Sequence, residues 1–309
     1  MKKTYILIIL FLISFSLLNA QSADTLRKEI LDVALIRVVY KTEQRALKEG
    51  QPYIVPDTMA LEIGDAWSKY YSYFRQIKDS VAVYNRLNDA YPLLGRTFGS
   101  NDEELQARLE SKQEIHDKLD DRQYGEPSII YKNRLKNEVM TLDDGPFMGN
   151  GYTLFRFSEE IPPQNWEIQT DTATVLNYLC QKAVTTFRGR AYAAWFTTDI
   201  PVGEGPWKLY GLPGMILKAE DSEGVFRFEA IGIEKVQNKP IEVVFDYQNF
   251  YNGRLIIFRR KVIDGNLKQW QTHRKERFKN ISIAFVTSVA IRYYRTKNPI
   301  IYPEMEIIK

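Results

Sequence analysis

Residues 187–217 read FRGRAYAAWFTTDIPVGEGPWKLYGLPGMIL, and this stretch is the most unusual of the chain. Its five glycines and three prolines stand between segments that read as strands, so the backbone must take several fixed and uncommon conformations here. The pair Gly205-Pro206 and the run 211–214, Gly-Leu-Pro-Gly, predict two successive tight turns, in which proline fixes φ and glycine supplies a positive φ or a close backbone approach. The stretch therefore predicts a rigid corner in a β-sheet.

Aromatic and cationic side chains stand around these turns. They predict either the mouth of a ligand site or a structural corner that closes the sheet, and the structural role is the commoner one for such aromatic and glycine-rich corners. As a ligand mouth or partner patch, the corner would bind through these residues: Arg190, Trp195, Trp207, Tyr210, Gly211, Leu212, Pro213 and Gly214.

The segments around the corner predict a meander of strands. After Pro127, short apolar runs follow one another, separated by Gly, Pro, Asn and Asp clusters. This spacing predicts sequential antiparallel pairing, because parallel neighbours would need crossover helices. Residues 221–224, Asp-Ser-Glu-Gly, predict the clearest hairpin turn.

Upstream of Pro127 the pattern is mixed. Residues 33–42 predict a first strand after a short helical turn at 25–30, and residues 58–74 predict two strands that turn at Gly64-Asp65. Apolar residues at helical spacing predict helices at 75–88 and 101–121. Residues 245–280 carry no period that separates helix from strand.

Together these patterns predict an α+β fold that is mainly antiparallel β: a curved sheet or incomplete β-barrel with accessory helices. The aromatic share of 13% agrees with this, because aromatic residues favour strands. By analogy of fold alone, such an open half-barrel resembles the periplasmic lipoprotein carriers, which hold acyl chains.

The N-terminus predicts export. Residues 1–20 combine two lysines, an apolar run and a small residue at Ala20, which is the pattern of a signal peptide. We expect residues 21–309 to form a single domain in the periplasm or at the outer-membrane periphery. No integral membrane segment is expected after cleavage, because no second stretch approaches spanning length.

Composition removes several classes of chemistry. A formal net charge of +3 argues against nucleic acid as a partner, and one Cys with two His leaves too few ligands for an ordinary zinc site. We expect no metal, no cofactor and no catalytic residue, because phosphate-loop and nucleophile-elbow motifs are missing. Cys180 lies in an apolar strand, where a buried and unreactive thiol is expected. The paired acids Asp143-Asp144 and Glu159-Glu160 read as solvated turn residues.

Residues 211–216 read GLPGMI, within a wider pattern that comprises Cys180, Ala183, 187–190, Tyr192, 194–197, Ile200-Pro201 and Gly205-Pro206. On these residues the sequence resembles the GLPGLI family, a group of uncharacterised exported proteins of Bacteroidetes-type bacteria. The resemblance extends more loosely from Val39-Tyr40 to Asn298-Pro299, and Met215 replaces Leu with little change in volume. It implies an envelope protein, often encoded near outer-membrane transport genes, and it carries over no catalytic residue.

These observations favour an exported protein that binds an apolar, lipid-like ligand or an outer-membrane transport protein without catalysis. Two alternatives stay open: an envelope hydrolase using carboxylate chemistry, and a structural accessory of an outer-membrane transporter. A hydrolase predicts two convergent acids in the main pocket, a carrier predicts an apolar pocket, and an accessory predicts an exposed apolar patch. The ligand's identity and the oligomeric state lie beyond the sequence.

Overall fold

The computed structural model describes residues 26–48, 50–73, 128–144, 153–251 and 254–272. The predicted signal peptide at 1–20, the predicted helices at 75–88 and 101–121, and both histidines lie outside the described residues. None of the helices in the described part of the chain is long and apolar enough to cross a membrane.

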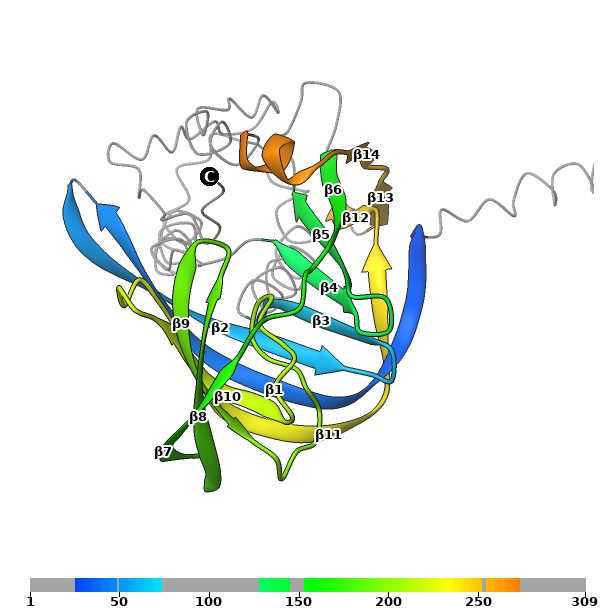
Figure 1. The fold of residues 1–309 in the computed structure, drawn as a ribbon. Helices are drawn as coiled ribbons and strands as arrows, with labels where there is room; N and C mark the ends of the chain where they lie inside the picture. Colours follow the sequence, from blue (N-terminus) through cyan, green and yellow to red (C-terminus); the bar gives the residue numbers. More distant parts are fainter. Residues whose placement is uncertain (1–25, 49, 74–127, 145–152, 252–253, 273–309) are drawn as a thin grey trace, which may run out of the picture.

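Most of the described strands belong to one mainly antiparallel sheet, which is not closed into a barrel (Figure 1). Its order is β14-β6-β5-β4-β3-β2-β1-β11-β10-β9-β8-β7, and only the β14–β6 pair is parallel among the described pairs. The bounds are β1 (Lys28–Lys48), β2 (Gln51–Ile63), β3 (Trp67–Ser72), β4 (Ile129–Asn133), β5 (Glu138–Asp144), β6 (Thr153–Glu160), β7 (Glu167–Val175), β8 (Tyr178–Phe187), β9 (Arg190–Thr197), β10 (Met215–Asp221), β11 (Phe226–Val244) and β14 (Lys261–Asp264). A separate hairpin pairs β12 (Tyr247–Tyr251) with β13 (Arg254–Phe258), and a short helix begins at residue 267.

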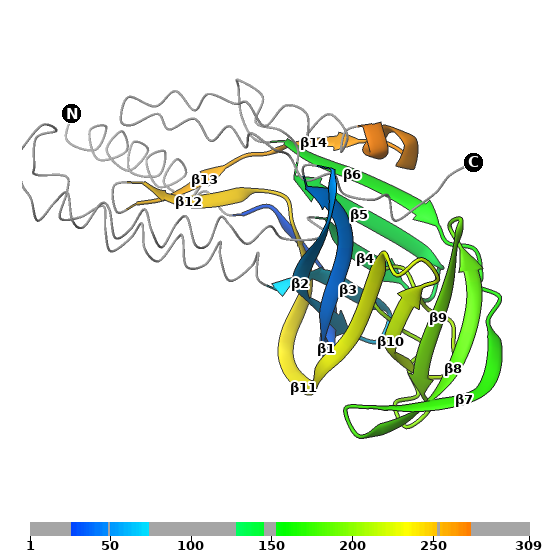
Figure 2. The same ribbon diagram turned by 90° about the vertical axis from the view of Figure 1, so that its left-hand side faces the viewer.

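The sheet has two arms that meet at the long strands β1 and β11. Strands β2 to β6 follow one another on one side of β1, and β10 to β7 follow one another beyond β11. Register shifts in the β1–β11 pair lie at 30/32, 34/36 and 39/40 of β1, and such bulges bend a strand and increase its twist. Figures 1 and 2 show the resulting curvature, with β1 and β11 curving between the arms.

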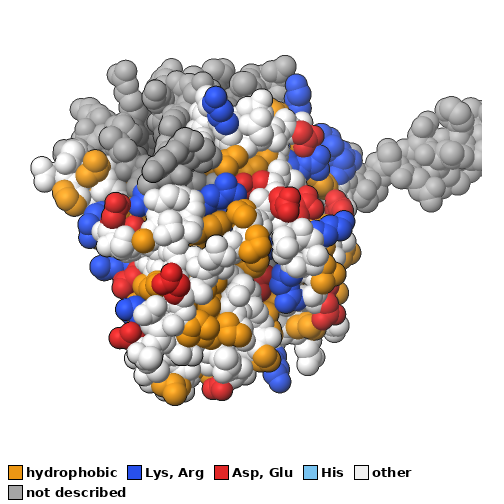
Figure 3. All heavy atoms as spheres, viewed as in Figure 1, with side chains coloured by type: hydrophobic (Ala, Val, Ile, Leu, Met, Phe, Trp, Pro, Cys, Tyr) orange, Lys and Arg blue, Asp and Glu red, His pale blue; other side chains and the backbone are white. Residues whose placement is uncertain are grey.

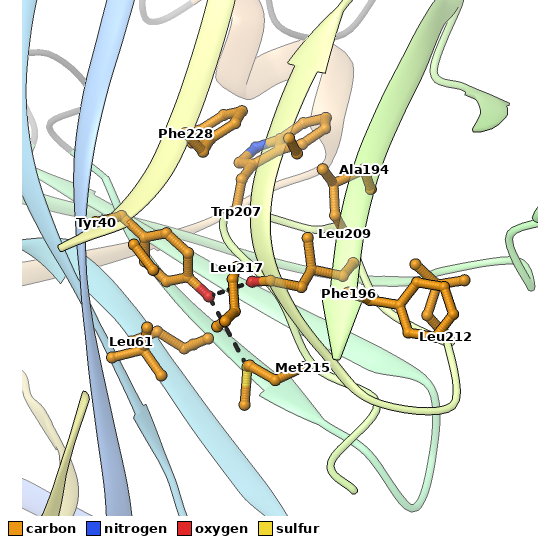
Figure 4. Close-up of a cluster of buried hydrophobic side chains, with 14 of the residues drawn as sticks. Tyr40, Leu61, Ala194, Phe196, Trp207, Leu209, Leu212, Met215, Leu217 and Phe228 are labelled. Atoms are coloured by element: carbon orange, nitrogen blue, oxygen red, sulfur yellow. Dashed lines mark hydrogen bonds between the residues drawn. The ribbon is translucent and has the colours of Figure 1, made fainter. Parts of the chain in front are cut away.

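The main core lies on one face of this bent sheet. A row of directly opposed side chains crosses four strands and is buried there: Val38, Leu61, Tyr70 and Ile130. Tyr40 of β1 donates its hydroxyl to the carbonyl oxygen of Ile216 at 2.7 Å, and Figure 4 shows it directed toward Met215. Tyr131, which follows Ile130 on β4, points to the opposite face because successive strand residues alternate in direction. There it joins a second buried cluster with Leu142 and Leu154.

Several predicted elements are confirmed. The strand at 33–42 lies within β1, the turn at Gly64-Asp65 joins β2 to β3, and residues 221–224 join β10 to β11. The helical turn at 25–30 is wrong, because Lys28 already pairs with Val244 in the sheet. The undecided segment 245–280 forms β12, β13, β14 and the short helix as far as residue 272.

The predicted sequential pairing holds within each arm but is wrong between the arms. Strands β6 and β7 are consecutive in the chain, yet they lie at opposite sides of the sheet order. Strand β11 instead returns to β1, because its long apolar and polar alternation pairs along most of that strand. The local sequence pattern does not indicate which distant strand each strand pairs with.

The turn between β2 and β3 depends on Asp32 of β1. Its carboxylate accepts hydrogen bonds from the backbone N–H groups of Ala66 at 2.7 Å and Trp67 at 2.9 Å. Burial alone would raise the pKa of Asp32, but these backbone hydrogen bonds outweigh it and hold the pKa below its usual value. A Cβ atom at Gly64 would meet the carboxyl carbon of Asp32 at 2.6 Å, so glycine is required beside it.

We predict that Asp32→Ala lowers the free energy of unfolding by about 1–2 kcal/mol at pH 7, because two partly buried N–H donors lose their acceptor. The folded pKa is depressed, so the contribution of Asp32 is present above the unfolded pKa of about 3.9 and is lost as the pH falls through the folded pKa. Urea unfolding at pH 7 and pH 3 measures both effects. The exposed Asp199→Ala variant is the control, and an equal loss in both variants would contradict the assignment.

Candidate functional site

The corner predicted from the sequence is formed by residues 198–214 between β9 and β10. Leu209 N–H donates to Pro206 O at 3.1 Å to close a turn after Gly205-Pro206, and Gly211 N–H donates to Gly203 O at 3.0 Å. Gly211 has a φ of 91°, whereas Gly214 is not among the positive-φ residues. A Cβ at Gly214 would lie 2.0 Å from the carbonyl oxygen of Thr197, so Gly214 is required for a close backbone approach.

The structure separates the eight candidate binding residues. Trp207, Leu212 and Gly214 are buried in the main core, and the Trp207 ring lies 5.7 Å from that of Phe187. Arg190 is also buried, Tyr210 and Trp195 are half-buried, and Gly211 and Pro213 are exposed. Figure 4 shows Trp207 and Leu212 among the core side chains. These residues therefore do not form one continuous binding surface.

A buried ion pair ties the corner to the opposite arm of the sheet. Lys132 of β4 pairs with Glu204 of the corner, and their side chains are only 5% and 1% exposed. The ammonium group of Lys132 also donates to Gly205 O at 2.9 Å. Ser68 of β3 donates to Glu204 Oε1 at 3.3 Å. The two charges thus compensate each other, which fits a structural role.

A second ionic cluster ties the corner to β6. Lys208 donates to Glu159 Oε1 at 2.5 Å, and Arg188 of the β8–β9 turn donates to Glu159 Oε2 at 2.6 Å. The Lys208 side chain is only 1% exposed. The reading of Glu159 as a solvated turn acid is therefore wrong, because it lies in a strand that faces the corner. Asp143 is likewise buried in β5 and accepts from Trp270 Nε1 at 3.2 Å.

Arg190 completes the polar contacts of this arm at the β10–β11 hairpin. It pairs with Asp221 at 3.2 Å and with Glu223 at 3.1 Å. Asp221 also accepts from the backbone N–H groups of Val225 and Phe226, each at 2.7 Å. Arg190 therefore holds a buried acid of this chain, which accounts for its burial without a ligand.

Another buried acid, Glu62 of β2, lies on the face opposite the main core. Tyr71 donates its hydroxyl to Glu62 at 2.7 Å, and Arg37 and Lys239 form ion pairs with the same carboxylate. Burial and the Glu62 charge raise the pKa of Tyr71 well above its usual value. Glu62 thus connects β1, β3 and β11 through these contacts.

Cys180 is buried in β8, as the sequence predicts. Burial raises the pKa of its thiol, and a hydrogen bond from the Val175 backbone opposes that shift in part. A protonated, buried thiol is a poor nucleophile. Among the described residues, no group of three or more His, Cys, Asp or Glu side chains is arranged to hold a metal ion.

The groove on β7–β10 is a cavity of about 390 Å³ lined by Asn165, Glu167, Val184, Thr185, Thr186, Ala191, Tyr192, Ala193, Glu220, Asp221 and Ser222. Four of these residues oppose one another in register across the four strands: Glu167, Val184, Ala193 and Glu220. They therefore stand on one face of the sheet. Small side chains form the floor, and a carboxylate stands at each side.

An aromatic side chain stands one row from this floor. Trp195 is two residues from Ala193 on β9, so both side chains project from the same face. Lys182 and Lys218 lie opposite Trp195 on the neighbouring strands, with their ammonium groups 5.9 and 5.1 Å from its ring centre. Trp195 therefore lies on the groove's face of β9, although it is not one of the residues that line the cavity.

The groove offers several hydrogen-bonding side chains, including the acids Glu167, Glu220 and Asp221. Glu167 and Glu220 are three strand spacings apart, which corresponds to about 14 Å between their backbones. Figure 3 shows acidic and basic side chains interspersed over the visible face, without an extended region of one sign.

Sequence reasoning missed the residues that carry the buried ion pairs. Lys132 directly follows the apolar run 129–131 in β4, and Glu204 stands between two glycines inside the predicted corner. A charged residue in a segment that is expected to be buried indicates a partner of opposite charge, because charged side chains are rarely buried unless they are paired. Their pairing with each other is not visible in the sequence, because 71 intervening residues separate them.

Comparisons with known proteins found a family model that matches part of the chain and two solved structures that are similar to it. A family model described as "N-glycanase peptide, N-terminal domain" matches residues 130–257, which is less than half of the chain. Two solved structures of PNGF-II, in the C2 and P21 space groups, are similar at 13% and 15% identity, each with a TM-score of 0.43. They cover 79% and 82% of this chain, and the chain spans only 33% and 37% of theirs. None of the curated proteins matches the chain.

The expected membership of the GLPGLI family is wrong. The matching family model is the N-glycanase N-terminal domain, and its span includes the motif at 211–216. The physical reason lies in what the motif encodes. Gly211 supplies a positive φ and Gly214 a close approach, which are local requirements of a turn rather than marks of one family.

We predict that Gly214→Val costs about 3 kcal/mol of unfolding free energy, because its Cβ collides with the backbone of Thr197. Met215→Leu conserves volume in the same buried segment and should cost less than about 1.5 kcal/mol. Thermal and urea unfolding of both variants measure the difference. Equal melting temperatures would show that the backbone at Gly214 can move aside.

We predict that Lys132→Met lowers the unfolding free energy by about 3–5 kcal/mol, because it leaves the Glu204 carboxylate buried without its cation. The double variant Lys132→Met with Glu204→Gln should lose less than the sum of the two single variants. A double-mutant cycle by urea unfolding measures this coupling. Additive losses would mean that the two side chains do not interact.

Proposed function

We propose that this protein is an exported, non-enzymatic binding protein that holds a glycan chain in the groove on β7–β10. The observation that carries the proposal is the groove itself, which has a floor of small residues and carboxylates at both sides, with Trp195 on the same face of β9 two residues from Ala193. Polar groups placed around a concave surface fix a ligand's orientation and provide specificity.

The lining matches the chemistry of a sugar chain. Carboxylates such as Glu167 and Glu220 accept hydrogen bonds from hydroxyl groups, and the side chains of Thr186, Ser222 and Asn165 both donate and accept them. Small residues on the floor, such as Ala191, let a flat and hydroxylated ring approach the backbone. Trp195 adds an apolar ring beside the polar floor, where the carbon face of a sugar can stack.

The partial match to an N-glycanase N-terminal domain supports the same ligand class, because an N-glycanase acts on glycans. Residues 130–257 include every residue that lines the groove. The chain corresponds to about a third of the PNGF-II structures, so the activity of that whole protein is not transferred here.

The proposal includes the fold and the location expected from the sequence. We interpret the open, bent sheet as an incomplete barrel whose inner side is occupied by the corner, with Leu209 and Leu212 in its core. This occupancy is why we favour a glycan over a lipid-like ligand. Export to the envelope rests on the signal-peptide pattern of residues 1–20.

Docking on an envelope protein is a second candidate, favoured by the β7–β8 hairpin. Its apolar side chains Ile168 and Leu179 are 51% and 66% exposed, and Leu176 at the tip is 36% exposed with a φ of 49°. Exposed apolar side chains gathered on one hairpin are typical of a contact surface. A transporter accessory would use this hairpin rather than the groove.

We predict that Trp195→Ala weakens binding of N-glycopeptides about tenfold, which corresponds to about 1.4 kcal/mol, while the melting temperature changes little. The loss follows from removing the stacking surface, and partial exposure limits the effect on stability. Calorimetric titration of glycopeptides, and of the same peptides after enzymatic removal of the glycan, measures it.

The matched control is Tyr178→Ala. Tyr178 is also a half-buried aromatic residue, and it lies on β8 at the end of the strand that is far from the groove. It should bind like the natural protein. Equal affinity for glycosylated and deglycosylated peptides would overturn the proposal, and so would an equal loss in both variants.

A further inference from the structure

A second cavity lies where the described chain begins, away from the groove and the corner. It measures about 570 Å³ and is lined by Leu26, Arg27, Lys28, Phe245, Arg259 and Val262. Three of its six lining residues are cations, and it shares no lining residue with the groove. The start of β1, the residues after β11 and the link between β13 and β14 meet here.

A buried acid organises two of these cations. The side chain of Asp246 is fully buried, and its Oδ1 accepts from Arg27 Nε at 2.9 Å and Nη2 at 2.6 Å. Its Oδ2 accepts from Arg259 Nη1 at 2.5 Å and from the Arg27 backbone N–H at 2.8 Å. Burial would raise the pKa of Asp246, but these hydrogen bonds outweigh it and lower the pKa, so the acid is ionised at neutral pH.

The cations remain open to the cavity. The side chains of Arg27, Arg259 and Lys28 are 48%, 46% and 48% exposed, although each is held by an acid. Lys28 pairs with Glu242 at 3.0 Å. Arg27 Nη1 donates to none of the described residues.

The acids of the site are shared among its cations. Asp246 forms ion pairs with both Arg27 and Arg259, and Glu242 forms an ion pair with Lys28. Arg260 adds another cation at the rim, where its guanidinium donates to the carbonyl oxygens of Phe245 and Val244, each at 2.7 Å.

We propose that this cavity binds a phosphate-type oxyanion. Guanidinium groups recognise phosphate through paired N–H donors, and Asp246 holds two of them in place before the ligand arrives. Three cations from separate segments favour a tetrahedral ligand with several oxygens over a carboxylate, which has two. Leu26, Phe245 and Val262 supply apolar walls for the carbon part of a phosphate ester.

A purely structural clamp is the competing explanation. Asp246 ties the start of β1 to residues 259–260, and this alone would account for both arginine contacts. A clamp does not need Lys28, because Lys28 pairs with Glu242 and has no hydrogen bond or ion pair with Asp246 among the described residues. Lys28 therefore distinguishes a binding site from a clamp.

The test titrates the natural chain with inorganic phosphate at low and constant ionic strength, with chloride as the reference anion, and follows melting temperature and heat of binding. Phosphate should raise the melting temperature above that in chloride, and Lys28→Gln should weaken phosphate binding about tenfold without unfolding the protein. Arg259→Gln should abolish phosphate binding. If Arg259→Gln does not fold, the Lys28→Gln variant still tests the proposal.

Arg227→Gln is the matched control, because Arg227 on β11 is 53% exposed and also lies near acids, Glu43 and Glu220. It removes the same charge and should retain phosphate binding. Equal effects of phosphate and chloride would overturn the proposal, as would equal losses in Lys28→Gln and Arg227→Gln.

Vesicles separate a free ligand from a lipid headgroup. The oxyanion is a lipid headgroup if the protein binds phosphatidylglycerol vesicles but not phosphatidylcholine vesicles, and if Lys28→Gln weakens that binding. Phosphate binding without vesicle binding would assign it to a soluble phosphate compound. Both results support an oxyanion site, and the absence of both would overturn it.

Discussion

The ion pair between Lys132 and Glu204 joins the two arms of the sheet across its inner side. Lys132 belongs to β4 of one arm, and Glu204 belongs to the corner that leaves β9 in the other. An ion pair with side chains this buried is costly to break, because a remaining charge would lack both water and its partner. The position of the corner therefore depends on both charges being present.

Other contacts made by the corner, or by the strand that follows it, also hold the corner in position. Lys208 reaches Glu159 of β6, Tyr40 of β1 reaches Ile216, and Tyr210 donates its hydroxyl to Ile161 O at 3.1 Å. An open sheet leaves its inner face to be covered, and here a corner inserted from one arm covers part of it with apolar side chains such as Trp207, Leu209 and Leu212 (Figure 4). Closing the sheet edge to edge is not needed for burial when the corner fills the inner side.

This arrangement separates the corner from most residues of the two sites proposed for binding. The corner side chains face the core and are satisfied within the chain, so they contribute chiefly to stability. The groove contacts the corner through Tyr192, whose ring centre lies 6.2 Å from that of Trp207, and the cavity at Asp246 is lined by none of the corner residues. The two proposals are independent, because the groove is built by β7–β10 and the second cavity by the start of β1 and the residues after β11.

The sequence by itself determined the local elements. Alternating strands, the hairpin at 221–224, the turn at Gly64 and the buried Cys180 follow from period, turn chemistry and polarity, which neighbouring residues carry. Only the tertiary structure decided that β11 returns to β1, that Trp195 turns away from Trp207, and that Lys132 meets Glu204. These outcomes depend on which distant segments become neighbours, and that choice is settled by the burial and charge balance of the whole chain rather than by any one segment.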